Sequence, residues 1–279
     1  MKKPEWDQII NNKPNSYFFL IKELYGSWDI IKTLFLRDLK VAYRETILGP
    51  IWYIINPLIT TGMFSILFEK IFKINGNFKS TFLFILSGII LWNFFTYNLT
   101  KISNFFSSYG KIFAKIYFPK ATIIIVYTLI SLFHFLIQII MFSIILYILN
   151  NAIFPIFKIH LIIITISYVA MTSIGIGLII NSISYKYKDI SQILPFFTNL
   201  FMFVTPVLYS SEKITEKYLF FYFLNPLAIP FEYFKALIFN LNFQVETKYI
   251  LSGLIINIII IFTGLEMYRR TESTYTDYR

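Results

Sequence analysis

The feature that most constrains this chain is a series of apolar stretches, each about as long as a membrane-spanning helix. Apolar residues make up 57% of the 279 residues and charged residues only 14%, whereas soluble proteins average about 45–50% and about 25%. A helix needs roughly 17–25 apolar residues to cross a bilayer. We therefore predict an all-α integral membrane protein. Six spans are expected, at about residues 51–68, 81–99, 121–149, 161–183, 190–209 and 249–267.

A basic, amphipathic stretch precedes the first of these spans. Apolar residues recur three or four positions apart between about residues 16 and 45, and most charged residues lie off that stripe, which is the pattern of an amphipathic helix. Because the stretch carries Trp28 and several lysines and arginines, it suits the headgroup region of a membrane. Packing against the protein's own core is the alternative, and the two can hold together. At Leu48-Gly49-Pro50 the charges stop and the first span begins.

Prolines mark two irregular places along the chain. Asn56-Pro57 lies near the start of the first span, where the missing backbone N–H predicts a kink; this kink is either static or part of a moving gate. Residues 210–248 are apolar but are interrupted by Pro226 and Pro230. The interruption favours two short re-entrant helices before the last span, because irregular backbone at membrane depth is tolerated where protein or water covers it.

The lysines and arginines are distributed unevenly between the predicted connections. Of the 25 Lys and Arg residues, 17 lie before the first span, after the second, fourth and sixth spans, and 8 lie in the other connections. By the positive-inside rule, both termini are expected in the cytoplasm. This bias accounts for the net charge of +10, and nucleic acid is not expected as a partner. We divide the chain into a cytoplasmic segment with the amphipathic helix (1–48), a membrane domain (49–268) and a cytoplasmic tail (269–279).

The sequence contains no motif for catalysis or nucleotide binding. It has no cysteine and two histidines, and it lacks the patterns G-x-x-x-x-G-K-[ST], G-x-S-x-G and H-E-x-x-H. No pair of acids lies within a predicted span, so an ion-coupled carrier would have no evident proton relay. We therefore expect no catalytic residue, metal site or cofactor in this chain. If the protein drives transport uphill, the energy must come from another polypeptide.

Polar and small residues inside the spans have structural interpretations. His134 and Gln138 lie four positions apart on one face of the third span. We expect an interhelical hydrogen bond from them, with a functional polar site as the alternative. Ser173 and Gly177 are spaced for close helix packing in the fourth span. Trp92 lies towards the end of the second span, at a position typical of the aromatic belt of membrane proteins.

Short motifs occur in a characteristic order over nearly the whole chain after about residue 30. They are Arg37-Asp38-Leu39-Lys40, Tyr43-Arg44, Leu48-Gly49-Pro50, Trp52, Asn56-Pro57, Gly88, Leu91-Trp92-Asn93-Phe94-Phe95, Lys115, Phe118-Pro119 and Asn225-Pro226-Leu227. This layout resembles the type-2 ABC transporter permeases that export lipid-linked polysaccharides such as O-antigen, capsule and teichoic acid. The first motifs are quite specific, and the others are individually weak.

The resemblance implies a role for each part of the chain. The amphipathic helix would lie flat on the inner leaflet as an interface helix, the segment from Asn104 to Lys115 would dock on an ATPase as a coupling helix, and the two short helices would form an outer gate. Two copies of the chain would form a channel lined mainly by the first and fifth spans. Two copies of a cytoplasmic P-loop ATPase subunit would bind ATP and Mg. The implied location is the bacterial cytoplasmic (inner) membrane.

Candidate site residues follow from these implied roles. The substrate is expected to contact the inner mouth first and to leave through the outer gate. The candidates are Lys40, Arg44, Leu48, Gly49 and Trp52 for substrate admission and the headgroup, Asn56 and Pro57 for a gate or kink, Asn104, Tyr109, Lys111 and Lys115 for coupling to the ATPase, and Tyr222, Asn225 and Pro226 for the outer gate.

The predicted function is that of the transmembrane subunit of an ATP-driven exporter, not an enzyme itself, that moves undecaprenyl-linked polysaccharide for lipopolysaccharide or capsule biosynthesis. Teichoic-acid exporters commonly carry an acidic residue where Tyr53 follows Trp52 here, which favours an O-antigen or capsule substrate. The alternatives are the same fold exporting teichoic acid, lipid or a drug, and a membrane-embedded glycan or polyprenyl-phosphate transferase. Such a transferase would need clustered acids, arginines or histidines at a membrane edge, whereas the acids here are scattered.

Overall fold

The computed structural model describes residues 26–44, 48–68, 78–113, 119–211, 214, 216–241 and 245–277. Every regular element within these residues is a helix, which confirms the predicted all-α class for this part of the chain. The elements are α2 (Trp28–Arg44), η1 (Gly49–Ile51), α3 (Trp52–Ile66), α4 (Phe78–Ser103), α5 (Phe105–Phe113), α6 (Thr122–Asn150), η3 (Ile156–Lys158), α7 (Ile159–Ser184), α8 (Asp189–Val204), α9 (Glu216–Phe223), α10 (Ala228–Phe239) and α11 (Thr247–Asp277). The part of the predicted amphipathic helix before residue 26 lies outside the described residues.

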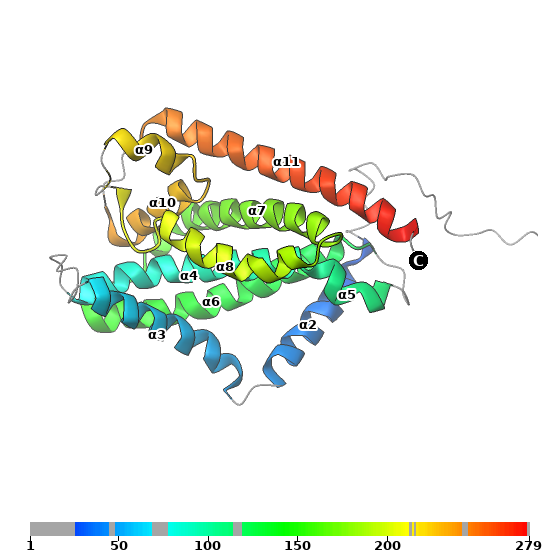
Figure 1. Ribbon diagram of the computed structural model, residues 1–279. Helices are drawn as coiled ribbons and strands as arrows, with labels where there is room; N and C mark the ends of the chain where they lie inside the picture. The colour runs from blue at the N-terminus through cyan, green and yellow to red at the C-terminus, as the bar shows by residue number, and fades with distance from the viewer. Residues whose placement is uncertain are drawn as a thin grey trace, which may run out of the picture.

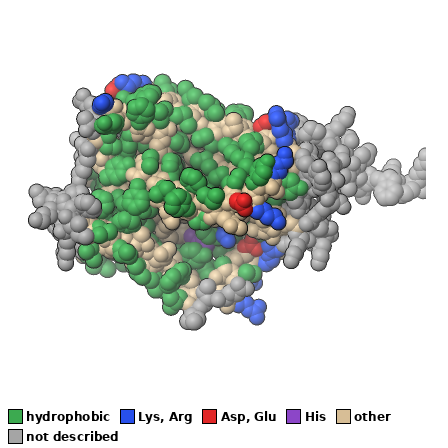
Figure 2. All heavy atoms as spheres, in the orientation of Figure 1, with side chains coloured by type: hydrophobic (Ala, Val, Ile, Leu, Met, Phe, Trp, Pro, Cys, Tyr) green, Lys and Arg blue, Asp and Glu red, His purple; other side chains and the backbone are tan. Residues whose placement is uncertain are grey.

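The long helices α4, α6, α7 and α11 run roughly side by side along the length of the molecule (Figure 1). Helix α4 packs against both α6 and α7, and α7 packs against α11. Of the four, α4 is the most enclosed by protein and α11 the least. Hydrophobic side chains cover most of the face seen in Figure 2, and the charged side chains gather towards its ends. This distribution fits a bundle whose middle lies in lipid.

Within the described residues, four helical segments are long and apolar enough to cross a membrane. They are Thr81–Ser103, Thr122–Asn150, Ile156–Ser184 and Thr247–Glu272, and they correspond to the predicted second, third, fourth and sixth spans. The predicted first span is represented by the 15-residue α3 and the fifth by the 16-residue α8. Helix α3 passes the same test only together with α2, which it meets at 89°. The chain is therefore a multi-pass membrane protein, and the count of six crossings stays a prediction.

Two large apolar clusters hold the long helices together, and a third, of Tyr222, Phe223 and Ala228, lies at α9 and α10. Of the first two, the larger one is built mainly around α4, α6, α7 and α10, and the smaller one joins α2 and α5 to α6. Trp92 belongs to the larger cluster and is only 5% exposed. Its indole ring contacts the rings of Phe95, Phe201 and Phe231. The aromatic-belt prediction for Trp92 is therefore wrong, because this side chain faces neighbouring helices of the same chain.

Helix α2 rests on the protein with one face. Its residues Ile31, Leu34 and Leu39 are buried in the smaller apolar cluster. This confirms the alternative in which the amphipathic stretch packs on the protein's own core. Other apolar side chains of α2, such as Leu36 and Val41, are exposed, so packing on the protein leaves a second apolar surface for the membrane.

Small residues let α7 approach its neighbours closely, as predicted from Ser173 and Gly177. The Oγ of Ser173 accepts a hydrogen bond of 2.8 Å from Nδ2 of Asn98 on α4. A Cβ atom at Gly264 of α11 would come within 2.5 Å of the carbonyl oxygen of Gly175. Since both partners in that contact are backbone, neither helix can move aside without losing its packing against the other.

We predict that Gly264→Ala destabilises the folded protein. The added methyl group would push α11 away from α7, and overpacking of this kind costs about 1–3 kcal/mol. Heat denaturation of the purified protein in detergent, followed by tryptophan fluorescence, measures the effect. Gly62→Ala is the matched control, because a Cβ built at Gly62 meets nothing within 4 Å. Equal unfolding midpoints for the two variants would contradict the prediction.

Candidate functional site

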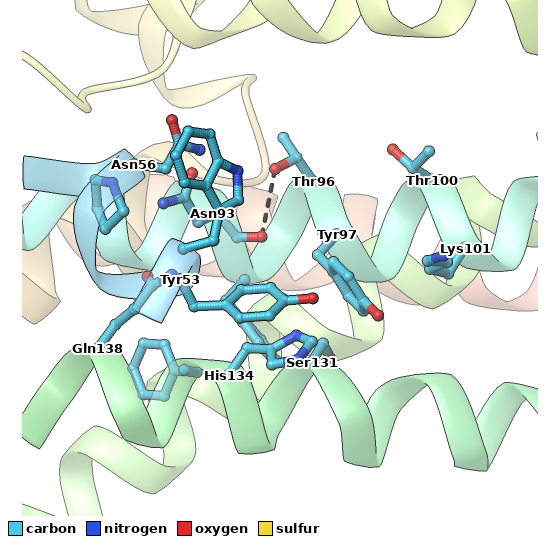
Figure 3. A pocket seen from close by; sticks show the side chains of 14 residues that line it. Tyr53, Asn56, Asn93, Thr96, Tyr97, Thr100, Lys101, Ser131, His134 and Gln138 are labelled. Carbon is cyan, nitrogen blue, oxygen red and sulfur yellow. Dashed lines mark hydrogen bonds between the residues drawn. The ribbon is translucent and has the colours of Figure 1, made fainter. Parts of the chain in front are cut away.

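A cavity of about 320 Å³ lies between α3, α4 and α6 (Figure 3). The polar residues of α4 and α6 that line it recur at three- and four-residue spacings, which places them on one face of each helix. Helix α3 covers them from the other side. The lining residues are Trp52, Tyr53, Asn56 and Pro57 of α3, Asn93, Phe94, Thr96, Tyr97, Thr100 and Lys101 of α4, and Ser131, His134, Phe135 and Gln138 of α6.

Aromatic rings from α3, α4 and α6 meet at His134 in the middle of the cavity. The rings of Tyr53 and His134 stack with their centroids 3.7 Å apart and their planes 17° from parallel. The ring of Tyr97 meets His134 edge-on, at a centroid distance of 4.8 Å. In Figure 3 the Tyr53 ring lies directly over the His134 ring. The cavity therefore has a rigid aromatic wall, held by contacts among three helices.

The predicted hydrogen bond from His134 and Gln138 to another helix is wrong. Both residues are only 4% exposed. Neither ring nitrogen of His134 nor Oε1 of Gln138 has a hydrogen-bond partner within the described part of the chain. Leaving such a group buried and unpaired costs about 1–3 kcal/mol. The two side chains instead line the cavity, where they can bond to whatever occupies it.

The charge of the cavity is positive. Among the described residues that line it, Lys101 is the one charged side chain, and its Nζ lies 5.6 Å from the centroid of the Tyr97 ring. The remaining polar groups are neutral amides, hydroxyls and an imidazole. The arrangement suits a polar ligand that is neutral or carries negative charge. Within the described residues, no group of three His, Asp or Glu side chains could hold a metal ion.

The structure separates the residues predicted for substrate admission and for the gate or kink. Trp52, Asn56 and Pro57 line the cavity. Lys40 and Arg44 are exposed on α2, outside the cavity, and Leu48 is exposed at the turn before α3. Gly49 forms that turn with a φ of +51°, a left-handed conformation that glycine adopts without strain. Glycine at position 49 therefore allows this conformation immediately before α3.

Tyr109, predicted to contact an ATPase, is instead 3% exposed and joins α5 to α2. Its hydroxyl donates a hydrogen bond to Asp38 and accepts one of 2.8 Å from Nη2 of Arg37. The guanidinium of Arg37 also donates to Asp38 at 2.7 Å. Burial and the bond to the Asp38 carboxylate raise the pKa of Tyr109, so the phenol stays a hydrogen-bond donor. This cluster of three residues ties the two helices together.

The other coupling candidates are described only in part. The Nδ2 of Asn104 donates a hydrogen bond of 3.0 Å to the carbonyl oxygen of Thr100, at the junction between α4 and α5. The side chain of Lys111 and the whole of Lys115 lie outside the described residues. Their roles stay predictions.

Of the outer-gate candidates, Tyr222 and Asn225 are buried, and each makes its own side-chain hydrogen bonds around α9 and α10. The Tyr222 hydroxyl donates to Oε1 of Glu232 at 2.6 Å. Nδ2 of Asn225 donates to Oγ1 of Thr205 at 3.0 Å, and its Oδ1 accepts a bond from the backbone N–H of Leu227 at 2.9 Å. Pro226 lies in the turn that Asn225 stabilises. Glu232 also accepts bonds from the backbone and side chain of the 210–211 segment.

Among the described residues, Lys235 of α10 is the most deeply buried charged side chain, and sequence reasoning missed it. It is 1% exposed. Its Nζ donates to the carbonyl oxygens of Pro206 at 2.6 Å, Val207 at 2.9 Å and Tyr209 at 3.2 Å. It also lies 3.9 Å from the centroid of the Phe84 ring. The available signal was a glutamate and a lysine three positions apart in an otherwise apolar helix, which places both on one face.

Comparison with known proteins places this bundle in a family. The family model described as "ABC-2 type transporter" matches residues 30–239. Because the match covers well over half of the chain, the chain belongs to the ABC-2 type transporter family.

Individual relatives match along most of their length. The chain is 25% identical over 254 residues to the O-antigen export system permease protein RfbA of Klebsiella pneumoniae, covering 90% of this chain and 95% of that protein. It is 25% identical over 259 residues to the polysialic acid transport protein KpsM of Escherichia coli, covering 87% and 93%. It is 22% identical over 198 residues to an RfbA of Myxococcus xanthus, covering 71% and 75%.

We predict that Lys235→Met loosens the segment after α8. Methionine cannot donate to the three carbonyl oxygens, and leaving buried groups unpaired should cost about 3 kcal/mol in all. Hydrogen–deuterium exchange of the purified protein should become faster at residues 205–211. Lys217→Met on α9, where the lysine is exposed, is the control and should leave exchange unchanged. The same exchange rate in both variants would show that Lys235 does not hold this segment.

Proposed function

We propose that this chain is the transmembrane subunit of an ATP-driven exporter of lipid-linked polysaccharide, of the O-antigen or capsule type. The observation that carries the proposal is similarity over almost the full length of two relatives, one named as an O-antigen export permease and the other as a polysialic acid transport protein. The chain lacks a phosphate-binding glycine loop. A separate P-loop ATPase subunit, in two copies, therefore binds ATP and Mg and supplies the energy.

The proposal includes an arrangement in the bacterial inner membrane. Helices α3 and α8 complete six crossings together with the four longer helices. The membrane domain comprises residues 49–268, between a cytoplasmic N-terminal segment and a cytoplasmic tail. The distribution of lysines and arginines supports cytoplasmic termini. Two copies of the chain form the channel along α3 and α8, and α9 and α10 dip into the outer leaflet as the gate. Exposed apolar side chains on α3 and α8, such as Met63 and Phe197, support a contact between copies along these helices.

The exposed side of α2 is the proposed surface for capturing substrate. Leu36 and Val41 are exposed and apolar, and Lys40 and Arg44 are exposed and basic. A helix with these two kinds of side chain lies in the headgroup region of a bilayer. Lys40 and Arg44 would attract the diphosphate that links an undecaprenyl lipid to its polymer.

The cluster of Arg37, Asp38 and Tyr109 is the proposed path from the ATPase to the substrate. If α5 docks on the ATPase, a displacement of α5 is passed to α2 through these hydrogen bonds. Because the cluster joins two helices that are otherwise held by apolar contacts, it fixes their relative position more sharply than packing alone.

Deleting the gene in its own organism tests the function directly. We expect undecaprenyl-linked polymer to accumulate on the cytoplasmic side and surface polymer to disappear, with both restored by a plasmid copy. Immunoblotting of intact and permeabilised cells against the polymer measures this. Surface polymer at the normal level would contradict the proposal. Loss of polymer synthesis itself would favour the membrane-embedded transferase.

The variant Tyr109→Phe tests the coupling path. It removes one hydroxyl and keeps the buried ring, so the fold and the membrane level of the protein should stay as in the wild type. We expect surface polymer to fall severalfold, because Asp38 loses the hydrogen bond that joins α2 to α5. Tyr187→Phe is the control, since Tyr187 is 63% exposed. Wild-type export by Tyr109→Phe would remove the cluster from the mechanism.

A further inference from the structure

The cavity between α3, α4 and α6 has hydrogen-bonding capacity that the described part of the chain does not use. Oε1 of Gln138 and both ring nitrogens of His134 are buried there without partners. Other unpaired buried atoms of the described residues, such as Oδ1 of Asn181 and Oδ1 of Asn257, lie outside the lining, so His134 and Gln138 are distinguished by their position beside an open volume. A pair that serves packing alone would be more stable as apolar residues. Their position in the lining indicates that an occupant supplies the missing partners.

The shape and chemistry of the wall narrow the class of occupant. The face of a sugar ring is apolar and stacks on aromatic rings, while its hydroxyls need donors and acceptors around the edge. Tyr53 and Tyr97 supply flat rings. Amide groups such as those of Asn93 and Gln138 supply both donors and acceptors. A volume of about 320 Å³ is at the lower end of sites that take a small organic molecule.

The position of the positive charge in the cavity indicates how an occupant would be oriented. Lys101 lies towards one end of the cavity and Gln138 towards the other (Figure 3). Lys101 belongs to the last turn of α4, next to the junction with α5, which packs with α2 in the smaller apolar cluster. No acidic side chain is found among the described lining residues. A ligand with a neutral polar body and an anionic end would therefore place its anion at Lys101.

We propose that this cavity binds the lipid-proximal sugar of the exported glycan, with the adjoining phosphate at Lys101. The inference rests on the proposed function and assigns a substrate-recognition site within it. Lys40 and Arg44 on α2 meet the diphosphate first, at the leaflet. Tyr53, His134 and Gln138 then hold the sugar, so the protein distinguishes a loaded lipid carrier from an empty one.

Binding to the full-length protein in lipid nanodiscs tests the site. The probe is undecaprenyl diphosphate bearing one N-acetylglucosamine. Undecaprenyl diphosphate without sugar and N-acetylglucosamine 1-phosphate without lipid are the comparison ligands. We expect Gln138→Leu to weaken binding of the sugar-bearing lipid about fivefold, the loss of one hydrogen bond, and to leave the sugar-free lipid unaffected. Lys101→Met should weaken both lipids.

Matched variants separate binding from folding. Ser143→Ala alters a polar residue of α6 outside the cavity and should bind like the wild type. His134→Phe keeps a flat ring against Tyr53 but loses both nitrogens, and it provides a second measurement if Gln138→Leu is misfolded.

Unfolding midpoints at or above that of the wild type, combined with weakened sugar-lipid binding, would support the proposal. Wild-type binding by both variants would overturn it. Binding of the water-soluble sugar phosphate as tightly as the lipid would identify a site for free sugar phosphates and also overturn it.

The two proposals fail in different ways. If the gene deletion abolishes surface polymer while Gln138→Leu and His134→Phe restore it fully, the exporter function stands and the sugar site falls. If the deletion leaves surface polymer intact, the function itself falls.

Discussion

The structure depends on hydrogen bonds to the backbone groups that are left without helical partners where a helix ends inside the protein. Helix α8 stops at Val204, and the next carbonyl oxygens cannot reach a helical partner. Lys235 of α10 donates to three of them. The segment can come this close to α4 because Gly88 has no side chain: a Cβ there would lie 2.3 Å from the carbonyl oxygen of Val207. One buried ammonium thus joins the end of α8 and the short helix α10 to the central helix.

The same requirement explains the contrast between the two polar regions of the bundle. Around α10, Glu232 accepts bonds from Tyr222 and from the 210–211 segment, so its carboxylate is well satisfied despite burial. Around α6, His134 and Gln138 keep unused hydrogen-bonding atoms beside an open volume. The first arrangement stabilises a fixed structure, whereas the second is suited to a ligand that comes and goes.

Hydropathy was sufficient to locate the four long helices, because an uninterrupted apolar run of that length has few other solutions. It failed at Trp92, since apolar composition does not distinguish a lipid-facing side from a protein-facing one. The cavity also could not be predicted from the sequence. It is formed by residues that are widely separated along the chain, Tyr53, Tyr97 and His134, and only the packing of α3, α4 and α6 brings them together. The buried role of Tyr109 depends equally on a contact with Asp38, 71 positions away.

The backbone contact between Gly175 and Gly264 limits which parts of the molecule can rearrange. Helices α7 and α11 touch with no side chain between them, so any sliding or rotation of one past the other meets main-chain atoms at once. Helices α7 and α11 therefore form one rigid unit. Any rearrangement of the bundle would move α7 and α11 together, whereas α3 and its bent junction with α2 lie on the side of the bundle away from α11 (Figure 1).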